Sequence, residues 1–502
     1  MPTHAAGGIS RRARDTMQNF AKVSYRYLPI AIQNAIVEHY GRATHRRRFG
    51  PEFERLSAFL EESEWYEPDR LRAYQEERLG LVIRHAYDTV PYYRDVMDEL
   101  RLRPPDVRRV EDLRKLPVLT RNELIANRDR LRSSTVRRGL RKVSSSGTVG
   151  FPVTVWWDRA IDVVNNACTW RVRRWAGVGH GPRAATLLGK PIVPNRQKRP
   201  PFWRYNTSWN TVMFSCNHLR PDSLPLYVQT LRNERIETLH AYPSSAYILA
   251  RFLEAEGDHI PLKAVFLTGE PHLPIERRVI EERFQTKAFD AYGLAERVVY
   301  TSECDRHDGH HVFSEFGITE LINDAGDAVP AGGLARIVST SLHNMAMPLI
   351  RYDVGDTGIT RERSCECGRT LPMLESVTTR AEDILVLPDG RMVPPITASR
   401  AFWGIEGLRR EQVVQHRPDE IIARMEIDRD ITAAEEDGMR AYFLRRLGPD
   451  VRVVIERVDE IPLTATGKYR RVVSTVPLNL GAGDIPNRFA DAPLIESDER
   501  LT

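Results

Sequence analysis

Hydrophobic and polar positions change their period along the chain, and these changes predict the order of its elements. The first 130 or so residues are charged and follow a helical period, which returns at residues 158–177. A continuous apolar run at 262–270, "LKAVFLTGE", ends in glycine and is typical of a buried strand. A helical pattern follows at 274–284, and "KAFDAYG" at 287–293 reads as the next strand. A strand–helix–strand unit of this kind predicts an α/β fold with a parallel sheet.

Beyond residue 300 the period becomes alternating, which predicts antiparallel strands. The segments 311–322 and 334–342 alternate and are joined by a turn-rich linker, so they predict a long hairpin. The last hundred residues predict a strand at 419–428, a helix opened by a capping box of Thr432 and Glu435, and a returning strand. This pattern indicates a small α+β domain of its own.

The predicted fold class is therefore α/β, with a large domain of mixed sheets that includes a β-rich subdomain, and a small mobile α+β domain after it. We expect the following division: an N-terminal helical extension at 1–74, the large domain at 75–380, the small lid domain at 381–478 and a polar, disordered tail at 479–502. A chain of 502 residues is long enough for two or three domains.

Composition narrows the functional classes. With 41% hydrophobic and 28% charged residues, and no apolar run of membrane-spanning length, the pattern predicts a globular chain without a transmembrane segment or a signal peptide. The net charge of +5 comes from interspersed charges of both signs, which argues against nucleic-acid binding. Five cysteines without a secretory signal predict reduced thiols and a cytoplasmic location.

The stretch "VSSSGTVGFPVTV" at 143–155 places small hydroxyl residues and glycines between two β-branched runs. Such a loop presents backbone N–H groups and hydroxyl donors, which suit polyphosphate oxygens. It is not a Walker A loop, because no Gly-Lys-Ser/Thr follows at the required spacing. A flexible surface turn is the alternative reading of this loop alone.

Three later segments add chemistry in a fixed order. "AYGLAE" at 291–296 ends a predicted strand and offers the aromatic ring of Tyr292 and the carboxylate of Glu296, suited to a nucleobase and a hard cation. "IRYDVGDTG" places Asp356 in a glycine-flanked turn, where it could accept from ribose hydroxyls. "IPLTATGKYRR" presents Lys468, the only lysine after Lys287. Each segment alone also has a packing or turn explanation.

Together, these four segments resemble the motifs of the adenylate-forming superfamily of acyl- and aryl-CoA synthetases. "HAYPSSAYILA" at 240–250 and "CECGRTLP" at 365–372 further resemble its phenylacetate–CoA ligase-like branch. The resemblance covers roughly residues 75–475. It implies an AMP-forming acid–thiol ligase that uses ATP, Mg²⁺ and CoA.

The resemblance also implies roles for individual residues. Lys468 would bridge the carboxylate and the α-phosphate, Glu296 would bind Mg²⁺, Tyr292 would stack on adenine and Asp356 would hold the ribose. The remaining nucleotide-binding positions are Ser145, Ser146, Gly147, Thr148, Gly150, Gly269, Glu270, Gly293 and Arg380. Two departures from the family pattern, Phe151 in place of lysine and Ala295 in place of a hydroxyl residue, affect contacts near the phosphates.

The acid pocket is expected around Tyr242, Pro243 and Ser244. No lone charged residue in the sequence indicates a second ionic group on the substrate, which favours an aryl or medium-length acyl acid. Alternatives stay open: transfer of the activated acyl group to an amine, a hydroxyl or a carrier-protein thiol, or a non-catalytic nucleotide-binding module. The identity of the acid and the oligomeric state, a homodimer included, are also open.

A second site is predicted from three cysteines and one histidine. Cys304 lies in "ECDRHDGHHV", where His307, His310 and His311 follow it, and Cys365 and Cys367 lie in "CECG". Three thiolates and one imidazole form a closed ligand set for structural Zn²⁺. The resemblance favours His311 as the histidine ligand. The alternative is a set of free, reduced thiols without metal.

Overall fold

The structure, a computed structural model, describes most of the chain. The described residues are 25–144, 153–190, 192–272, 274–323, 325–378, 383–393, 396–402, 405, 408–427, 429–461, 470–479 and 484–485. Among them, no helix has both the length and the apolar character needed to cross a membrane.

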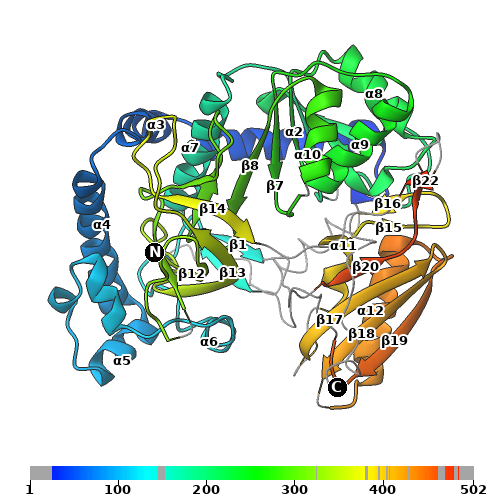
Figure 1. Cartoon of the computed structure of the whole chain (residues 1–502). Helices are drawn as coiled ribbons and strands as arrows, with labels where there is room; N and C mark the ends of the chain where they lie inside the picture. Colours follow the sequence, from blue (N-terminus) through cyan, green and yellow to red (C-terminus); the bar gives the residue numbers. More distant parts are fainter. Residues whose placement is uncertain are drawn as a thin grey trace, which may run out of the picture.

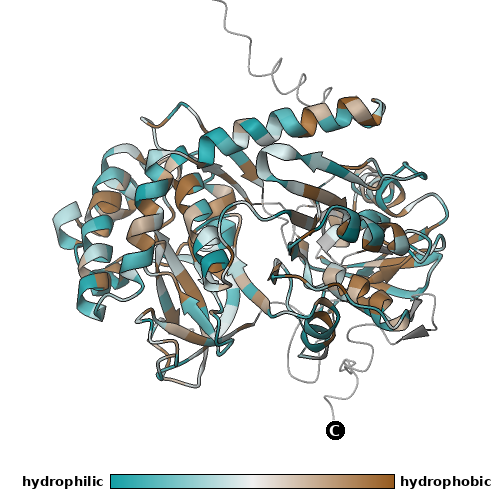
Figure 2. Ribbon diagram, turned by 90° about the horizontal axis from the view of Figure 1, so that it is seen from above, coloured by the Kyte–Doolittle hydropathy of each residue, from teal (hydrophilic) through white to brown (hydrophobic). Residues whose placement is uncertain are grey.

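The first described elements are helices that pack against the body of the protein (Figure 1). They are α2 (Ile30–Arg48), α3 (Pro51–Ser63), α4 (Pro68–Thr89), α5 (Pro91–Glu99) and α6 (Arg121–Ala126). The start of α6 confirms a capping box: the Thr120 hydroxyl accepts from the Glu123 N–H at 3.3 Å, and the Glu123 carboxylate accepts from the Thr120 N–H at 2.7 Å. Hydrophilic and hydrophobic residues alternate along the peripheral helices (Figure 2).

Twelve strands form one sheet in the described part of the chain, and its two halves differ in strand direction. Five neighbouring strands are parallel, in the order β5, β3, β6, β7, β8. Their bounds are β3 (Ala184–Leu188), β5 (Thr211–Ser215), β6 (Thr238–Ala241), β7 (Ala264–Thr268) and β8 (Ala288–Gly293), with β4 (Trp203–Asn206) antiparallel at the edge. The crossover helices are α8 (Leu224–Asn233), α9 (Pro243–Ala255) and α10 (Pro274–Phe284). The predicted unit of strand, helix and parallel strand is thus confirmed as β7–α10–β8.

The other half of the sheet is antiparallel and starts where β9 pairs with β8. It contains β9 (Tyr300–Ser302), β10 (His310–Val312), β11 (Gly317–Ile322), β12 (Leu334–Ser341), β13 (Tyr352–Thr360) and β14 (Met373–Thr378). The antiparallel pairing of β11 with β12 confirms the predicted long hairpin. Since β8 pairs with β7 on one side and β9 on the other, its carboxyl end lies at the junction of the two halves.

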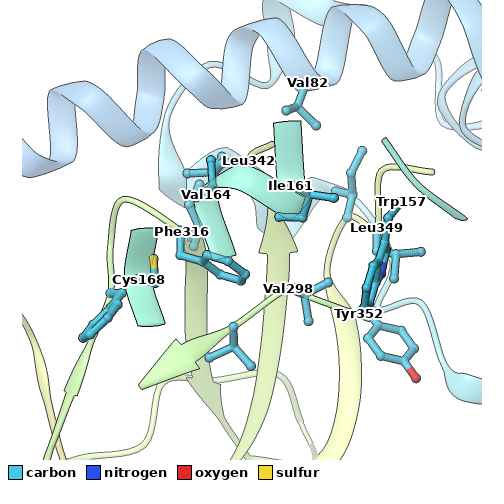
Figure 3. Packing of buried hydrophobic residues seen from close by; sticks show 14 of the residues in the cluster. Val82, Trp157, Ile161, Val164, Cys168, Val298, Phe316, Leu342, Leu349 and Tyr352 are labelled. Atoms are coloured by element: carbon cyan, nitrogen blue, oxygen red, sulfur yellow. The ribbon is translucent and has the colours of Figure 1, made fainter. Parts of the chain in front are cut away.

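Helix α7 (Arg159–Trp175) packs its apolar side onto this sheet. Figure 3 shows Ile161, Val164 and Cys168 of α7 close to Val298 and Phe316 in the largest buried cluster. Asp158 caps the helix by accepting from the Ile161 N–H at 3.0 Å. A short antiparallel pair, β1 (Arg141–Ser144) and β2 (Thr154–Trp157), precedes α7 and brackets the Ser/Thr/Gly segment, most of which lies outside the described residues.

The C-terminal part carries its own sheet, at the lower right of Figure 1. Within the described residues this sheet has four strands, in the order β19, β18, β17, β20, and α12 packs against it. The elements are β15 (Leu385–Val386), β16 (Met392–Val393), α11 (Ile396–Ser399), β17 (Leu408–Arg417), β18 (Glu420–Ile427), α12 (Ala433–Leu447), β19 (Arg452–Val458), β20 (Val472–Ser474), β21 (Leu478–Asn479) and β22 (Asp484–Ile485). The capping box of Thr432 and Glu435 opens α12 as predicted. The α/β fold class with a separate C-terminal unit is confirmed, whereas the domain boundaries stay predictions.

Candidate active site

The carboxyl ends of the parallel strands bring several predicted residues to one edge of the sheet, where α/β proteins bind ligands. Tyr292 and Gly293 end β8, Gly269 follows β7 and Tyr242 follows β6. A Cβ atom on Gly269 would lie 3.0 Å from the Tyr242 ring, and one on Gly189, after β3, would lie 3.1 Å from its hydroxyl. Two glycines therefore leave room for one aromatic ring at this edge. Gly269 also has φ +80°, which suits glycine.

Tyr292 and Asp356 are joined directly. The Tyr292 hydroxyl donates to the Asp356 carboxylate at 2.9 Å, which links the end of β8 to β13. Burial and the neighbouring Asp356 charge raise the pKa of Tyr292 well above its usual value, so the phenol stays protonated. A carboxylate has lone pairs for several donors, so Asp356 can accept from hydroxyl groups in addition to this phenol.

Glu296 lies just after β8 and is 5% exposed. The Tyr352 hydroxyl donates to its carboxylate at 3.3 Å. Burial raises the pKa of Glu296, while the Arg121 charge acts in the opposite direction. A buried carboxylate with a raised pKa gains most from a cation placed beside it.

Glu270 and the start of α9 form a second polar contact at this edge. The Glu270 carboxylate accepts from the Ser244 N–H at 3.2 Å, at the N-terminus of α9 where Pro243 is the first helical residue. Ser244 is fully buried. The contact satisfies one of the free N–H groups that every helix start carries.

A cavity of about 260 Å³ extends from the strand ends between the sheet and α7. Of the residues predicted for the site, Tyr292 and Gly293 line it, whereas Tyr242, Pro243 and Ser244 do not. Its walls also contain residues that the sequence reasoning missed. They are Trp157, Asn165, Thr169, Val172, Arg173, Phe266, Leu267, Thr268, Ala291, Leu294, Arg297 and Tyr300. His240 also lines the cavity and belongs to "HAYPSS", the segment expected to line the acid pocket. The missed signal is the i, i+4, i+8 spacing of Asn165, Thr169 and Arg173, which places three polar residues on one face of a mostly buried helix.

The predicted metal ligands come together. One donor atom each from Cys304, His311, Cys365 and Cys367 lies within 4.8 Å of all the others. The Sγ atoms of Cys304 and Cys365 are 3.6 Å apart, and Cys367 Sγ lies 3.5 Å from His311 Nε2. Tetrahedral Zn²⁺ with its usual bond lengths separates its donors by about 3.5–3.8 Å. The four residues therefore fit a zinc ion.

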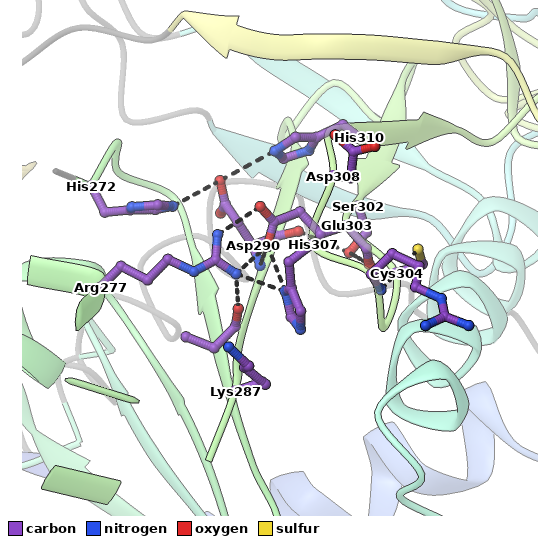
Figure 4. A network of polar contacts seen from close by, with 12 residues as sticks. His272, Arg277, Lys287, Asp290, Ser302, Glu303, Cys304, His307, Asp308 and His310 are labelled. Atoms are coloured by element: carbon purple, nitrogen blue, oxygen red, sulfur yellow. Dashed lines mark hydrogen bonds and ion pairs between the residues drawn. The ribbon is translucent and has the colours of Figure 1, made fainter. Parts of the chain in front are cut away.

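The other two histidines belong to a different cluster (Figure 4). His307 Nδ1 lies 2.7 Å from the Arg277 guanidinium, and Arg277 also forms a two-armed ion pair with Glu303, at 2.7 and 2.8 Å. His310 Nε2 lies 3.5 Å from the Asp290 carboxylate. Among the three histidines, the geometry thus selects His311 for the cysteine cluster.

Several predicted residues lie outside the described residues, and their roles stay predictions. They are Ser145, Ser146, Gly147, Thr148, Gly150, Arg380 and Lys468, together with the departure Phe151. Asp383, three residues after Arg380, is described: it is fully buried, pairs with Arg470 and accepts from the Ser474 N–H at 2.8 Å. The chain at this junction is therefore tied to β20.

Comparison with known proteins adds independent information. A model of the CapK C-terminal domain matches residues 385–475. The chain is 25% identical to a phenylacetate-coenzyme A ligase of Thermus thermophilus, over 81% of this chain and 96% of that protein. It is 23% identical to Protein CapK of Staphylococcus aureus, over 90% of this chain and 99% of that protein. These similarities confirm the resemblance that the motifs predicted.

The fold has a solved counterpart as well. A crystal structure of a 2-hydroxyisobutyryl-CoA ligase, in complex with 2-HIB-AMP and CoA in the thioesterification state, aligns with a TM-score of 0.56 at 21% identity. The alignment covers 82% of this chain and 91% of that chain. At this identity the likeness concerns the fold.

Proposed function

We propose that this chain, which belongs to the adenylate-forming superfamily and is similar to its phenylacetate–CoA ligase-like branch, activates a carboxylic acid with ATP and transfers the acyl group to CoA. The observation that carries the proposal is the cavity that reaches Tyr292 and Gly293, where the Tyr292 hydroxyl is bonded to Asp356. An acid in this cavity would lie beside a nucleotide at the strand ends.

The nucleotide would use the residues gathered at this edge. Tyr292 stacks on the base, Asp356 accepts from the ribose hydroxyls, and Gly269 and Glu270 border the site. The Ser145–Gly150 loop and Arg380 act on the phosphates and the domain junction. Mg²⁺, held by Glu296, supplies positive charge that offsets the negative charge of the phosphates.

Two anions must meet for the reaction to occur. The acid carboxylate oxygen attacks the α-phosphorus, the bond to the β-phosphate oxygen breaks, and pyrophosphate leaves; an acyl-adenylate remains. Lys468 places its ammonium between the carboxylate and the α-phosphate, so positioning and charge supply most of the rate enhancement. In the second step the thiolate of CoA attacks the acyl carbon, and AMP leaves with the bonding electron pair.

Transfer to an amine, a hydroxyl or a carrier-protein thiol in place of CoA is the second candidate. Residues 385–475 match the CapK C-terminal domain, and Protein CapK aligns with 90% of this chain. Similarity to a protein that is not named as a CoA ligase keeps this candidate beside CoA. The first step is the same for both candidates.

The cysteine cluster is proposed as a structural zinc site. With Cys304, His311, Cys365 and Cys367 all used as ligands, no coordination position is left for a substrate. The ion would hold the loop before β14 against β10 and so fix the antiparallel half of the sheet. None of the five cysteines forms a disulfide, which supports a reducing compartment, and we propose the cytoplasm.

Acid-dependent exchange between ATP and labelled pyrophosphate tests the first step. A panel of aryl, acyl and amino acids is assayed with the wild-type chain, with Lys468→Ala and with Lys287→Ala as the matched control. Lys287 is exposed and pairs with Glu281 at 3.4 Å on the surface. We expect exchange with one class of acid, at least about 100-fold less in Lys468→Ala, and unchanged in the control. Adding CoA then tests the acceptor, because transfer to CoA releases AMP. If no acid supports exchange, the alternative of a non-catalytic nucleotide-binding module is favoured.

A further inference from the structure

One charged side chain in the cavity has no counter-charge among the described residues. Arg173 lies on α7 and lines the cavity, and its guanidinium carbon is 4.5 Å from the centre of the Trp170 ring and 5.9 Å from that of Phe266. Within the described part of the chain, no carboxylate lies within ion-pair distance of it. Its neighbours differ: Arg171 pairs with Glu315 at 2.7 Å and Arg174 with Glu61 at 2.9 Å.

The other arginine of the cavity is also paired. Arg297 donates to the buried Asp162 carboxylate at 3.1 Å. Burial lowers the pKa of Arg173, because desolvation disfavours the charged guanidinium. Leaving a guanidinium charge in such surroundings costs free energy unless a ligand provides the counter-charge.

Arg173 lies at the level of Phe266, whose ring centre is 5.9 Å from its guanidinium carbon, and away from the strand ends. Phe266 is in register with His240 on one side and with Phe289 on the other, and all three lie before the carboxyl ends of their strands. Phe289 is three residues before Tyr292, so the two levels are about 10 Å apart along the strand. An acid whose reacting carboxylate is at Tyr292 therefore reaches the level of Arg173 with its opposite end.

His240 adds a neutral polar group at that level. Burial, with the charges of Arg173 and Lys190, lowers the pKa of His240 to about 3. Its imidazole is neutral near pH 7 and can donate one hydrogen bond. The remaining walls at this depth, Val172 and Phe266, are apolar and suit the carbon frame of the acid.

We propose that the acid carries a second carboxylate and that Arg173 is its counter-ion, with His240 as a hydrogen-bond donor beside it. The substrate class is then a diacid whose carboxylates are separated by one aromatic ring or a short alkyl chain. This inference rests on the proposed function, since it specifies the acid for the same site. It replaces the sequence-based expectation of an aryl or acyl acid without a second ionic group.

The test compares diacids with neutral isosteres of the same shape. Pyrophosphate exchange is measured with 4-carboxyphenylacetate against 4-methylphenylacetate, and with C5–C8 aliphatic diacids against the matching monoacids. Arg173→Gln removes the charge, Arg173→Lys retains it, and Arg174→Gln is the control. Binding of the same pairs is also measured by calorimetry without ATP. The diacid preference can therefore be tested even if the chain does not adenylate any acid. Circular dichroism shows that each variant is folded.

We expect the wild-type chain to favour at least one diacid over its isostere by 30-fold or more. Arg173→Gln should abolish that preference, while its exchange rate with the monoacid stays within threefold of the wild-type rate. Arg173→Lys should keep part of the preference, and Arg174→Gln should keep all of it. Equal binding of diacids and isosteres would overturn the proposal. So would a loss in Arg173→Gln that is equal for both members of each pair, because Arg173 would then serve the reacting carboxylate or the fold.

Discussion

The hydroxyl of Tyr292 donates a 2.9 Å hydrogen bond to the carboxylate of Asp356, across 64 positions of the sequence. The bond connects β8, the last parallel strand, to β13 in the antiparallel half. It thus fixes the orientation of the two side chains proposed to hold the base and the ribose of one nucleotide.

Tyr292→Phe removes this bond and keeps the ring. Because one hydrogen bond to a charged group contributes about 1.5–3 kcal/mol, we expect the KM for ATP to rise about 10-fold as Asp356 loses its orientation. The exchange rate at saturating ATP should change less than threefold. Asp356→Ala should raise the KM further, and an unchanged KM in both variants would argue against a ribose at Asp356.

Zinc is expected at one equivalent per chain. Cys365→Ser removes one ligand, so metal analysis should show loss of the ion, and the melting temperature should fall by about 5–10 °C because metal binding contributes to folding. Cys216→Ala alters a buried thiol outside the cluster and should keep the ion. A purified chain with no zinc and an unchanged melting temperature in Cys365→Ser would contradict the site.

Local signals in the sequence predicted much of the fold, but the residues of α7 show that such signals do not predict which side chain meets which neighbouring element. The helix itself follows from the period of residues 158–177, and β7–α10–β8 follows from two apolar runs around a helical one. Arg171, Arg173 and Arg174 look alike in the sequence, but successive side chains of a helix point about 100° apart around its axis. Arg171 is buried against Glu315, Arg173 lines the cavity and Arg174 reaches Glu61 on the surface. Which face meets which element depends on packing between distant segments.

The candidate site divides in the same way. The positions of Tyr292 and Glu296 could be predicted because they lie at and just after the end of a recognisable strand, and Cys304, Cys365 and Cys367 could be grouped because few residue types bind zinc. The resemblance favoured His311 over His307 and His310, and strand pairing gives the physical reason: β10 lies between β9 and β14 and thereby brings His311 to the cysteines.

The buried pair of Arg171 and Glu315 should matter for stability. The guanidinium donates to both carboxylate oxygens, at 2.7 and 3.2 Å, and Ser63 of α3 donates to the same carboxylate. Arg171→Met leaves Glu315 buried without a counter-charge, so we expect the free energy of unfolding to fall by about 3–5 kcal/mol. Urea unfolding of the full chain measures this. The double variant with Glu315→Leu should recover most of the loss, and equal destabilisation in both would show that packing, rather than charge, is responsible.

His343 should make the folded chain sensitive to acid. Its Nε2 lies 2.7 Å from the Glu315 carbonyl oxygen, and burial lowers its pKa to about 4. In the unfolded chain the pKa of histidine is about 6.5, so the unfolded state binds the extra proton between pH 6.5 and 4. The contribution of His343 to stability is therefore complete above pH 6.5 and is lost as the pH falls. The loss amounts to about 2 kcal/mol at pH 5.

His343→Gln tests this, because it keeps a hydrogen-bond donor but does not titrate. Between pH 7.5 and pH 5, the free energy of unfolding of the wild type should therefore fall by about 2 kcal/mol more than that of His343→Gln. Parallel curves for the two proteins would show that His343 takes up its proton in the folded state.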